Sequence, residues 1–265
     1  LDRAGKYTAA GVTAVAALDM LKPDYALAQQ VSSTDPDIVA EYVTYPSPEG
    51  HGEVRGYLVK PAGDGPHPAV VVVHENRGLN PYIEDVARRL AVLNFVAFAP
   101  DALTPVGGYP GDEDKARAAF AKLDAQKRTE DLMAAVPFLK ARPEATGKIG
   151  AVGFCFGGLM VNQMAVRFPE LAASVPYYGR QPAADDVAFI KAPLLIHYAS
   201  EDPNVNKGWP DFEAALKAHK VRYEMHMYPN TQHGFHNDTT PRYDEAAAKL
   251  SWQRTIDFFE KNVRG

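Results

Sequence analysis

The sequence predicts an α/β fold built around one mostly parallel sheet. From about residue 69 onwards, short apolar segments alternate with segments of helical periodicity, which is typical of strands joined by crossover helices. The segment 69–74 is a continuous apolar run, as expected of a strand buried on both faces. Nearer the start, 38–45 and 53–60 alternate apolar and polar residues around a turn rich in proline and glycine, which predicts an antiparallel hairpin.

The remaining elements follow in chain order from the same periodicities. The strands expected after the hairpin are 69–74, 95–98, 148–153, 173–177, 193–198 and 222–228. The expected helices are 82–93, 112–123, 129–139, 159–168, 210–218 and 243–261. Loops rich in glycine and proline separate them at 61–68 and 104–111. Because helices follow the strands to the end of the chain, we expect helices on both faces of the sheet.

Composition limits the class of protein. The chain has 265 residues with 46% hydrophobic content, which is enough for one large α/β domain. A net charge of -5 without a basic patch argues against nucleic acid as a partner. A single cysteine excludes an internal disulfide framework and a zinc site built from several cysteines. No apolar run approaches the roughly 18 residues that a membrane-spanning helix needs.

Residues 1–35 differ from the rest and are predicted to be a helical or signal-like extension before a domain at 36–265. The segment 9–18 is small and apolar, and Ala26-Leu27-Ala28 has the form of a signal-peptidase site. The extension resembles the tail of a twin-arginine export signal, although it has no arginine pair. The alternative is an amphipathic helix that lies on the domain. The expected location is cytoplasmic, or periplasmic if the extension is the remnant of an export signal.

The pentapeptide Gly153-Phe154-Cys155-Phe156-Gly157 joins an expected strand to an expected helix. Glycines flanking a nucleophile at such a junction form a nucleophile elbow, here with sulfur where a hydroxyl is more usual. The turn is so tight that glycine is needed on both sides, and the cysteine is forced into strained dihedrals. The elbow exposes sulfur at a helix N-terminus, which favours a thiolate. The alternative is a core cysteine beside a glycine-rich turn.

Two further polar residues follow later strands. Ligands gather at the carboxyl ends of parallel strands, which is where Asp202 and His233 are expected. The chain order is nucleophile, acid, histidine, with separations of 47 and 31 residues, which is the order of an α/β-hydrolase. In such a triad the histidine removes the proton of the nucleophile and the carboxylate fixes the histidine tautomer. The alternatives are that Asp202 is a turn residue, with Glu201 as its competitor, and that His233 is a solvated loop residue.

The strand at 69–74 ends in His74-Glu75-Asn76-Arg77-Gly78. An elbow needs a second donor from an earlier strand–helix loop, so the backbone N–H groups of Phe156 and Asn76 are expected to form the oxyanion hole. A carboxylate at Glu75 would repel a thiolate at Cys155 or accept its proton. The alternative is that Glu75 is a solvated loop residue.

These blocks resemble the dienelactone hydrolase family, also called carboxymethylenebutenolidases. The matching segments are 153–158, 74–78, 177–179 and 233–235, within a likeness over about residues 36–262. The resemblance implies an α/β-hydrolase fold and hydrolysis of an ester or lactone through a thioester acyl-enzyme, without metal or cofactor. It implies that Cys155 is the nucleophile, that Asp202 and His233 complete the triad, and that Glu75 pairs with the thiol before substrate binds.

One departure from that family concerns the substrate. Typical members place an arginine shortly after the catalytic histidine, where this sequence has His236-Asn237-Asp238. The candidate substitutes are Arg77, Lys115, Arg117 and Arg180, and Tyr178 is a further candidate for lining the pocket. The expected partner is a small-molecule ester or lactone, and a homodimer is compatible with the sequence.

Other functions fit parts of the sequence. A promiscuous carboxylesterase or phosphotriesterase would use the same elbow. A non-catalytic binding protein on the same fold is a further alternative, since fold does not fix function, but the retention of every triad member argues against it. A metal site would have to use His226, His233 and His236, yet no cysteine or carboxylate stands at a zinc-like spacing from them.

Overall fold

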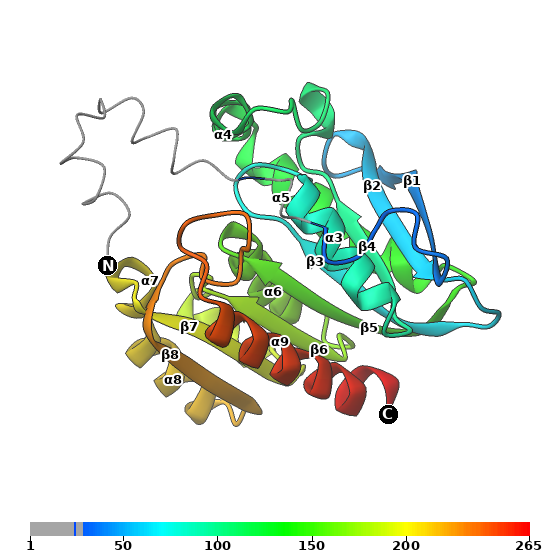
Figure 1. Ribbon diagram of the computed structural model, residues 1–265. Helices are drawn as coiled ribbons and strands as arrows, with labels where there is room; N and C mark the ends of the chain where they lie inside the picture. Colours follow the sequence, from blue (N-terminus) through cyan, green and yellow to red (C-terminus); the bar gives the residue numbers. More distant parts are fainter. Residues whose placement is uncertain (1–23, 25–28) are drawn as a thin grey trace, which may run out of the picture.

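The computed structural model describes residues 24 and 29–265, so most of the predicted extension at 1–35 lies outside the described residues. The described chain forms one eight-stranded sheet in the order β1-β2-β4-β3-β5-β6-β7-β8. The strands are β1 (Ile38–Ser47), β2 (Gly52–Pro61), β3 (His67–Val73), β4 (Val96–Pro100), β5 (Ala145–Phe154), β6 (Ala173–Tyr177), β7 (Leu194–Glu201) and β8 (Tyr223–Gln232). β2 pairs antiparallel with β1 and β4, and every later pair is parallel (Figure 1). The predicted fold class is confirmed.

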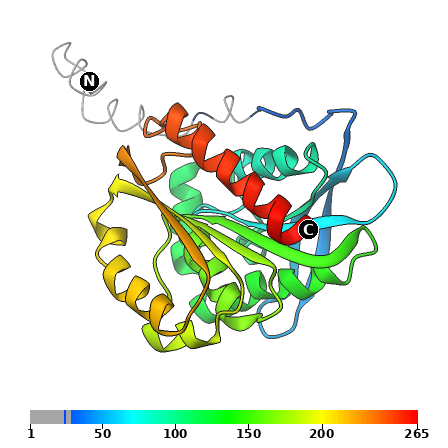
Figure 2. The same cartoon turned by 90° about the horizontal axis from the view of Figure 1, so that it is seen from below.

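Helices follow most of the parallel strands. They are α3 (Pro81–Ala91), α4 (Glu113–Lys122), α5 (Ala125–Lys140), α6 (Phe156–Arg167), α7 (Pro203–Asn206), α8 (Trp209–Ala218) and, after the last strand, α9 (Glu245–Phe259). The short 3-10 helices η2 (Thr104–Val106) and η3 (Ala184–Phe189) and the π-helix η4 (Glu260–Arg264) complete the set. Figure 2 shows α3 and α9 on one face of the sheet and α5, α6 and α8 on the other. Among the described helices, none is both long enough and apolar enough to span a membrane.

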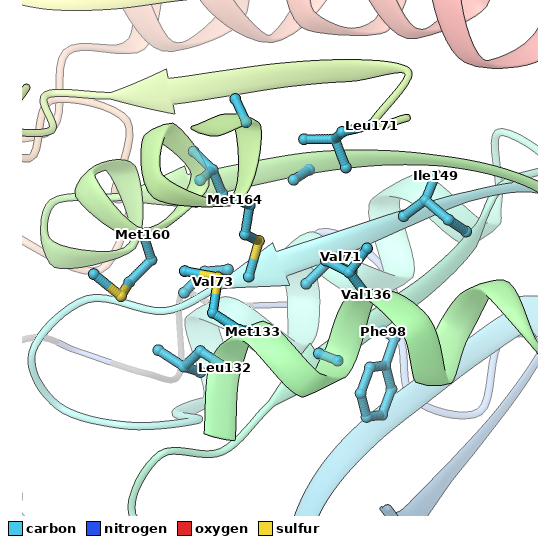
Figure 3. Packing of buried hydrophobic residues seen from close by; sticks show 14 of the residues in the cluster. Val71, Val73, Phe98, Leu132, Met133, Val136, Ile149, Met160, Met164 and Leu171 are labelled. Atoms are coloured by element: carbon cyan, nitrogen blue, oxygen red, sulfur yellow. The ribbon is translucent and has the colours of Figure 1, made fainter. Parts of the chain in front are cut away.

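The core has two parts, one on each face of the sheet. Successive side chains of a strand point to opposite faces, and β3 places apolar residues on both. Val71 and Val73 pack among side chains of α5 and α6 (Figure 3). Val70 and Val72 pack in the opposite cluster, with side chains of α3 and α9. All four valines are fully buried, which explains why the sequence here is a continuous apolar run.

Side-chain caps set the helix boundaries. α5 begins four residues before its expected start because Asp124 accepts a hydrogen bond from the backbone N–H of Lys127 at 2.9 Å. α9 begins at Glu245 because Asp244 accepts from the N–H of Ala247 at the same distance. The four-residue helix α7, which the periodicity did not predict, begins after Asp202 as its cap. A cap is a hydrogen bond between residues three apart, whereas apolar periodicity needs at least two helical turns to be recognised. Periodicity therefore does not locate helix starts that are set by a cap.

The chain before β1 is hydrogen-bonded to the domain. Val31 donates its backbone N–H to Asp85 Oδ1 at 3.0 Å, and its carbonyl accepts from Arg88 Nε at 2.7 Å. Asp24 donates its backbone N–H to the carbonyl of Thr239 at 2.7 Å. These contacts join the described part of the extension to α3 and to the loop before α9.

Gly157 lies where α6 crosses the end of β3. A Cβ atom added there would lie 2.2 Å from the carbonyl oxygen of Val73, which is part of the sheet and cannot move aside alone. We expect Gly157→Ala to lower the free energy of unfolding by roughly 2–4 kcal/mol. Gly63→Ala is the matched control, because nothing lies within 4 Å of its added Cβ. Urea unfolding compares the two, and equal midpoints would contradict the steric argument.

Candidate active site

The predicted site residues meet at the carboxyl edge of the parallel sheet. Cys155 follows β5, Tyr178 follows β6, Asp202 follows β7 and His233 directly follows β8. A cavity of about 510 Å³ opens between these loops. The predicted residues that line it are Asn76, Cys155, Phe156, Tyr178, Arg180, Asp202 and His233. The arrangement therefore brings the sulfur, the imidazole and the expected oxyanion-hole residues to one concave surface.

The elbow holds Cys155 in a strained conformation. Its φ is 57° and its ψ is -112°, and it caps the N-terminus of α6. Its backbone N–H donates to the carbonyl of Tyr177 at 3.0 Å, and its own carbonyl accepts from the N–H of Gly158 at 3.0 Å. The side chain is partly exposed and carries the one thiol of the chain. A positive φ at a non-glycine residue is maintained only where surrounding structure enforces it.

Asp202 and His233 are directly paired. His233 Nδ1 lies 2.5 Å from Asp202 Oδ2, and the Asp202 side chain is almost fully buried. The other carboxylate oxygen, Oδ1, accepts from the backbone N–H of Val205 at 3.3 Å, which fixes the carboxylate at the start of α7. The neighbouring Glu201 is exposed at the end of β7. The pairing leaves His233 Nε2 as the nitrogen available to the cavity.

Electrostatics around His233 favour its protonated form. Burial alone would lower the pKa of the imidazole, but hydrogen bonds and charge from Asp202 and Cys155 outweigh burial and raise the pKa to about 10. An imidazolium between a carboxylate and a thiolate is the ion pair that activates sulfur as a nucleophile. The surroundings of His233 therefore favour a positively charged imidazole between Asp202 and Cys155.

Tyr178 lines the cavity and its ring lies 5.0 Å from that of His233, whereas the predicted residue Glu75 is buried and is not part of the cavity lining. The Glu75 side chain is 6% exposed, and its Oε2 accepts from Asn237 Nδ2 at 3.2 Å. Tyr178 is fully buried with a φ of 38°, and its hydroxyl has no hydrogen-bond partner among the described residues. Burial raises the pKa of Tyr178 well above its ordinary value, and the charges of Glu75 and Cys155 raise it further. Glu75 and Tyr178 are therefore both buried, whereas Cys155 is partly exposed.

The loop after β3 is held by a buried histidine. His74 Nε2 accepts from the backbone N–H of Ala102 at 3.1 Å, so its Nδ1 must donate to the carbonyl of Glu75, 2.5 Å away. Burial lowers the pKa of His74, which keeps this neutral tautomer. Asp101 accepts backbone N–H groups from Leu79 and Leu103. These bonds fix the peptide that carries Asn76, the expected oxyanion donor.

The basic residues are placed differently from one another. Arg77 is outside the cavity lining, because its Nε lies 2.5 Å from Glu113 Oε2 and its Nη1 is 4.0 Å from Glu75. Lys115 and Arg117 are exposed on α4, where Arg117 pairs with Asp114. Arg180 does line the cavity.

Sequence reasoning missed Arg242, which also lines the cavity. Its guanidinium packs over Gly234, with Nη2 3.5 Å from the position of an added Cβ. Arg242 follows His233 by nine residues through an irregular loop, so neither periodicity nor a short motif could have predicted its position. The only available signal was its charge.

The three histidines that a metal site would need lie in different environments. His236 is buried, with Nδ1 2.6 Å from the Tyr82 hydroxyl. His226 stacks on His197 with ring centroids 6.2 Å apart, whereas His233 is paired with Asp202. Across residues 24 and 29–265, no group of three or more histidine, cysteine or acidic side chains is arranged to hold a metal ion.

A second cavity, of about 470 Å³, lies away from these residues. Its lining comes from the turn after β1, from α5 and from the end of α6, and is mainly apolar. The residues around Cys155 and His233 are not part of it. Of these two cavities, the one at the strand ends therefore contains the predicted catalytic side chains.

Comparison with known proteins identifies the family. A model of the dienelactone hydrolase family matches residues 54–263. The chain belongs to the dienelactone hydrolase family. A Bradyrhizobium protein named a probable 2-oxo-3-(5-oxofuran-2-ylidene)propanoate lactonase is 32% identical over 230 residues, which cover 81% of this chain and 92% of that protein.

Solved structures agree with this assignment. A Klebsiella pneumoniae protein named among the dienelactone hydrolases superposes with a TM-score of 0.75 at 26% identity, covering 84% of this chain and 99% of that one. A dienelactone hydrolase-like promiscuous phosphotriesterase from metagenomic libraries gives a TM-score of 0.72 at 26% identity, covering 85% of this chain and 99% of its own. The predicted family, the α/β-hydrolase fold and the assignment as a hydrolase of this type are confirmed.

The raised pKa of His233 gives a prediction that needs no substrate. Cys155→Ala removes one of the two groups that raise it, so the pKa of His233 should fall below 10, toward the ordinary value of 6.5. Asp202→Asn should lower the pKa of His233 as well, because the charge of Asp202 no longer offsets the effect of burial. Histidine titration by NMR measures both variants. An unchanged pKa in Cys155→Ala would show that the thiol and imidazole do not interact.

Proposed function

We propose that the protein hydrolyses a small ester or lactone with Cys155, His233 and Asp202 as a catalytic triad. The observation that carries this proposal is one cavity containing a strained elbow cysteine and a histidine that is bound to a buried carboxylate. Each element has a defined task in acyl transfer. The family supports the reaction class, and the geometry around Cys155 supports the choice of residues.

In the proposed mechanism, the Cys155 thiolate attacks the carbonyl carbon of the substrate. The C–O bond to the leaving group breaks, and the His233 imidazolium gives its proton to the departing alkoxide. A lactone opens in this step, so its hydroxyl remains attached to the acyl group. Neutral His233 then takes a proton from water, hydroxide attacks the thioester, and the C–S bond breaks. The carboxylic acid product leaves, and the thiolate–imidazolium pair is restored.

Two backbone N–H groups are proposed to stabilise the oxyanion. Phe156 is the first residue of α6, so its N–H is one of the free donors at the helix N-terminus. Asn76 lies across the same cavity on the loop after β3, which His74 and Asp101 hold in place. Donors fixed before the reaction are effective because they need no reorganisation when charge develops.

Glu75 is proposed to restrain the thiol while the site is empty. Glu75 is buried next to Asn76, which lines the cavity together with Cys155, and a carboxylate close to a thiolate repels it when both are ionised. A substrate carbonyl or carboxylate that displaces Glu75 would release the sulfur toward His233. The buried carboxylate would thereby couple thiol activation to substrate binding.

The cavity favours a substrate that carries a negative charge. Arg180 and Arg242 both line it, with exposed side chains that a ligand can reach. The Bradyrhizobium lactonase is named for a propanoate, which is an anionic lactone of suitable size. We therefore propose a lactone or ester with a carboxylate held by one or both arginines.

A promiscuous carboxylesterase or phosphotriesterase is the second candidate. It is favoured by the structural likeness to the dienelactone hydrolase-like phosphotriesterase. Hydrolysis rates for a panel of dienelactones, neutral lactones, aryl esters and aryl phosphotriesters distinguish the two functions. A carboxylate-selective lactonase would prefer the anionic members, whereas a promiscuous hydrolase would turn over the neutral ones equally well.

The triad itself is tested by residue replacement. Cys155→Ala should abolish hydrolysis, and iodoacetamide should inactivate the wild type with one label per chain, since the chain has one cysteine. Asp202→Asn should lower kcat by about 10²–10⁴. Glu201→Gln is the matched control and should stay near the wild type. Full activity in Cys155→Ala, or greater damage from Glu201→Gln, would overturn the assignment.

Substrate charge gives a separate prediction. Arg242→Gln should raise KM for an anionic lactone by roughly tenfold, because one charge-assisted hydrogen bond is lost, and should leave KM for a neutral aryl ester unchanged. Arg117→Gln, on the exposed surface of α4, is the control. Equal effects of Arg242→Gln on both substrates would assign Arg242 to structure and not to recognition.

A further inference from the structure

Glu75 receives its hydrogen bond from a distant part of the chain. Asn237, which lies 162 residues later, donates from Nδ2 to Glu75 Oε2 at 3.2 Å, and both side chains are buried. Arg77 approaches the same oxygen at 4.0 Å, but its Nε is held by Glu113 at 2.5 Å. The contacts converge on Oε2, which leaves the other carboxylate oxygen as the one able to act elsewhere in the site.

The orientation of the Asn237 amide follows from its other contacts. Asn237 Oδ1 lies 3.0 Å from the backbone nitrogen of Thr239 and 2.6 Å from the Thr239 hydroxyl. A backbone N–H can only donate, so the atom facing Thr239 must be the amide oxygen. The NH₂ group is therefore directed at Glu75, and Glu75 must accept through Oε2.

The loop that carries Asn237 is tied at several points. Asp238 Oδ2 accepts from Arg89 Nη2 and from Gln30 Nε2, both at 2.6 Å. The carbonyl of Thr239 accepts from the backbone N–H of Asp24 at 2.7 Å. The Thr240 hydroxyl donates to the carbonyl of Asn237 at 3.2 Å. A buried amide on such a restrained loop can hold a carboxylate in one rotamer.

We propose that Asn237 is the positioning residue for Glu75, and that its amide holds the buried carboxylate in one rotamer. An amide donates a hydrogen bond and adds no formal charge, so Asn237 orients the carboxylate without itself supplying a counter-charge. This inference rests on the proposed role of Glu75 in the hydrolase reaction, and it adds the residue through which that role is set.

A double-mutant cycle tests the proposal on the full chain. The variants are Asn237→Ala, Glu75→Gln and the pair, measured by kcat and KM on the best substrate and by the iodoacetamide inactivation rate at pH 7. Asn237→Ala should lower kcat at least about tenfold with a smaller change in KM, since a hydrogen bond to a charged group is lost. In the Glu75→Gln background the same change should have little effect, because Asn237 acts through Glu75.

Two controls keep the cycle interpretable. Thr240→Val disturbs the same loop but leaves the Asn237 side chain and its contacts in place, so kcat should stay near the wild type even if Tm falls. Asn237→Asp retains the oxygen that faces Thr239 and places a carboxylate against Glu75, so it tests the donor if Asn237→Ala does not fold. Its kcat should fall at least as far as that of Asn237→Ala.

The outcomes distinguish a failure of the positioning role of Asn237 from a failure of the proposed hydrolase function. If Asn237→Ala lowers kcat equally in both backgrounds, or if Asn237→Asp equals the wild type, the positioning role is wrong while the triad stands. If Glu75→Gln alone changes neither kcat nor the inactivation rate, the role of Glu75 and the positioning role fall together. If Cys155→Ala remains active, the proposed hydrolase chemistry itself fails.

Discussion

The close approach of α6 to the ends of β3 and β5 is the constraint on which the site depends. A Cβ at Gly153 would lie 2.1 Å from the carbonyl oxygen of Gly157, so strand, turn and helix pack as one unit with no room between them. The chain can pass through this turn only with Cys155 at a positive φ. The sulfur is therefore placed by backbone packing, before any side chain contact is considered. Asp202 and His233, which follow other strands, are then arranged around a sulfur whose position is already fixed.

One physical difference separates the histidines of this protein. Burial lowers the pKa of His74, His197 and His236, whose ring nitrogens bond to neutral backbone or hydroxyl groups. His233 is also largely buried, yet its pKa is raised to about 10 because Asp202 and Cys155 supply negative charge. Among these four buried imidazoles, the one in contact with both a carboxylate and a thiol is therefore the one whose pKa is raised.

The sequence predicts well what depends on local pattern or on position at a strand end. The two hairpin strands follow from apolar–polar alternation, and the other six strands and the elbow follow from apolar runs and glycine spacing. Cys155, Asp202 and His233 line one cavity because parallel strands share an edge. It does not predict Arg242 or the Asn237 contact, because both depend on the path of an irregular loop between β8 and α9. Arg77 shows the same limit: it adjoins Asn76 in sequence, but its guanidinium bonds to Glu113 on another element. The side chains of neighbouring loop residues can point in different directions.

The residues of the proposed triad follow strands that differ in how many neighbours they pair with. β5, which leads into Cys155, lies between two strands, whereas β8, which ends just before His233, is an edge strand and pairs with β7 alone. An edge strand has half the ladder bonds of a central one, so it opens at lower free energy. Local opening of β8 is therefore expected to move His233 away from Cys155 while the elbow stays in place, so the contact between imidazole and sulfur can be lost without unfolding of the central sheet.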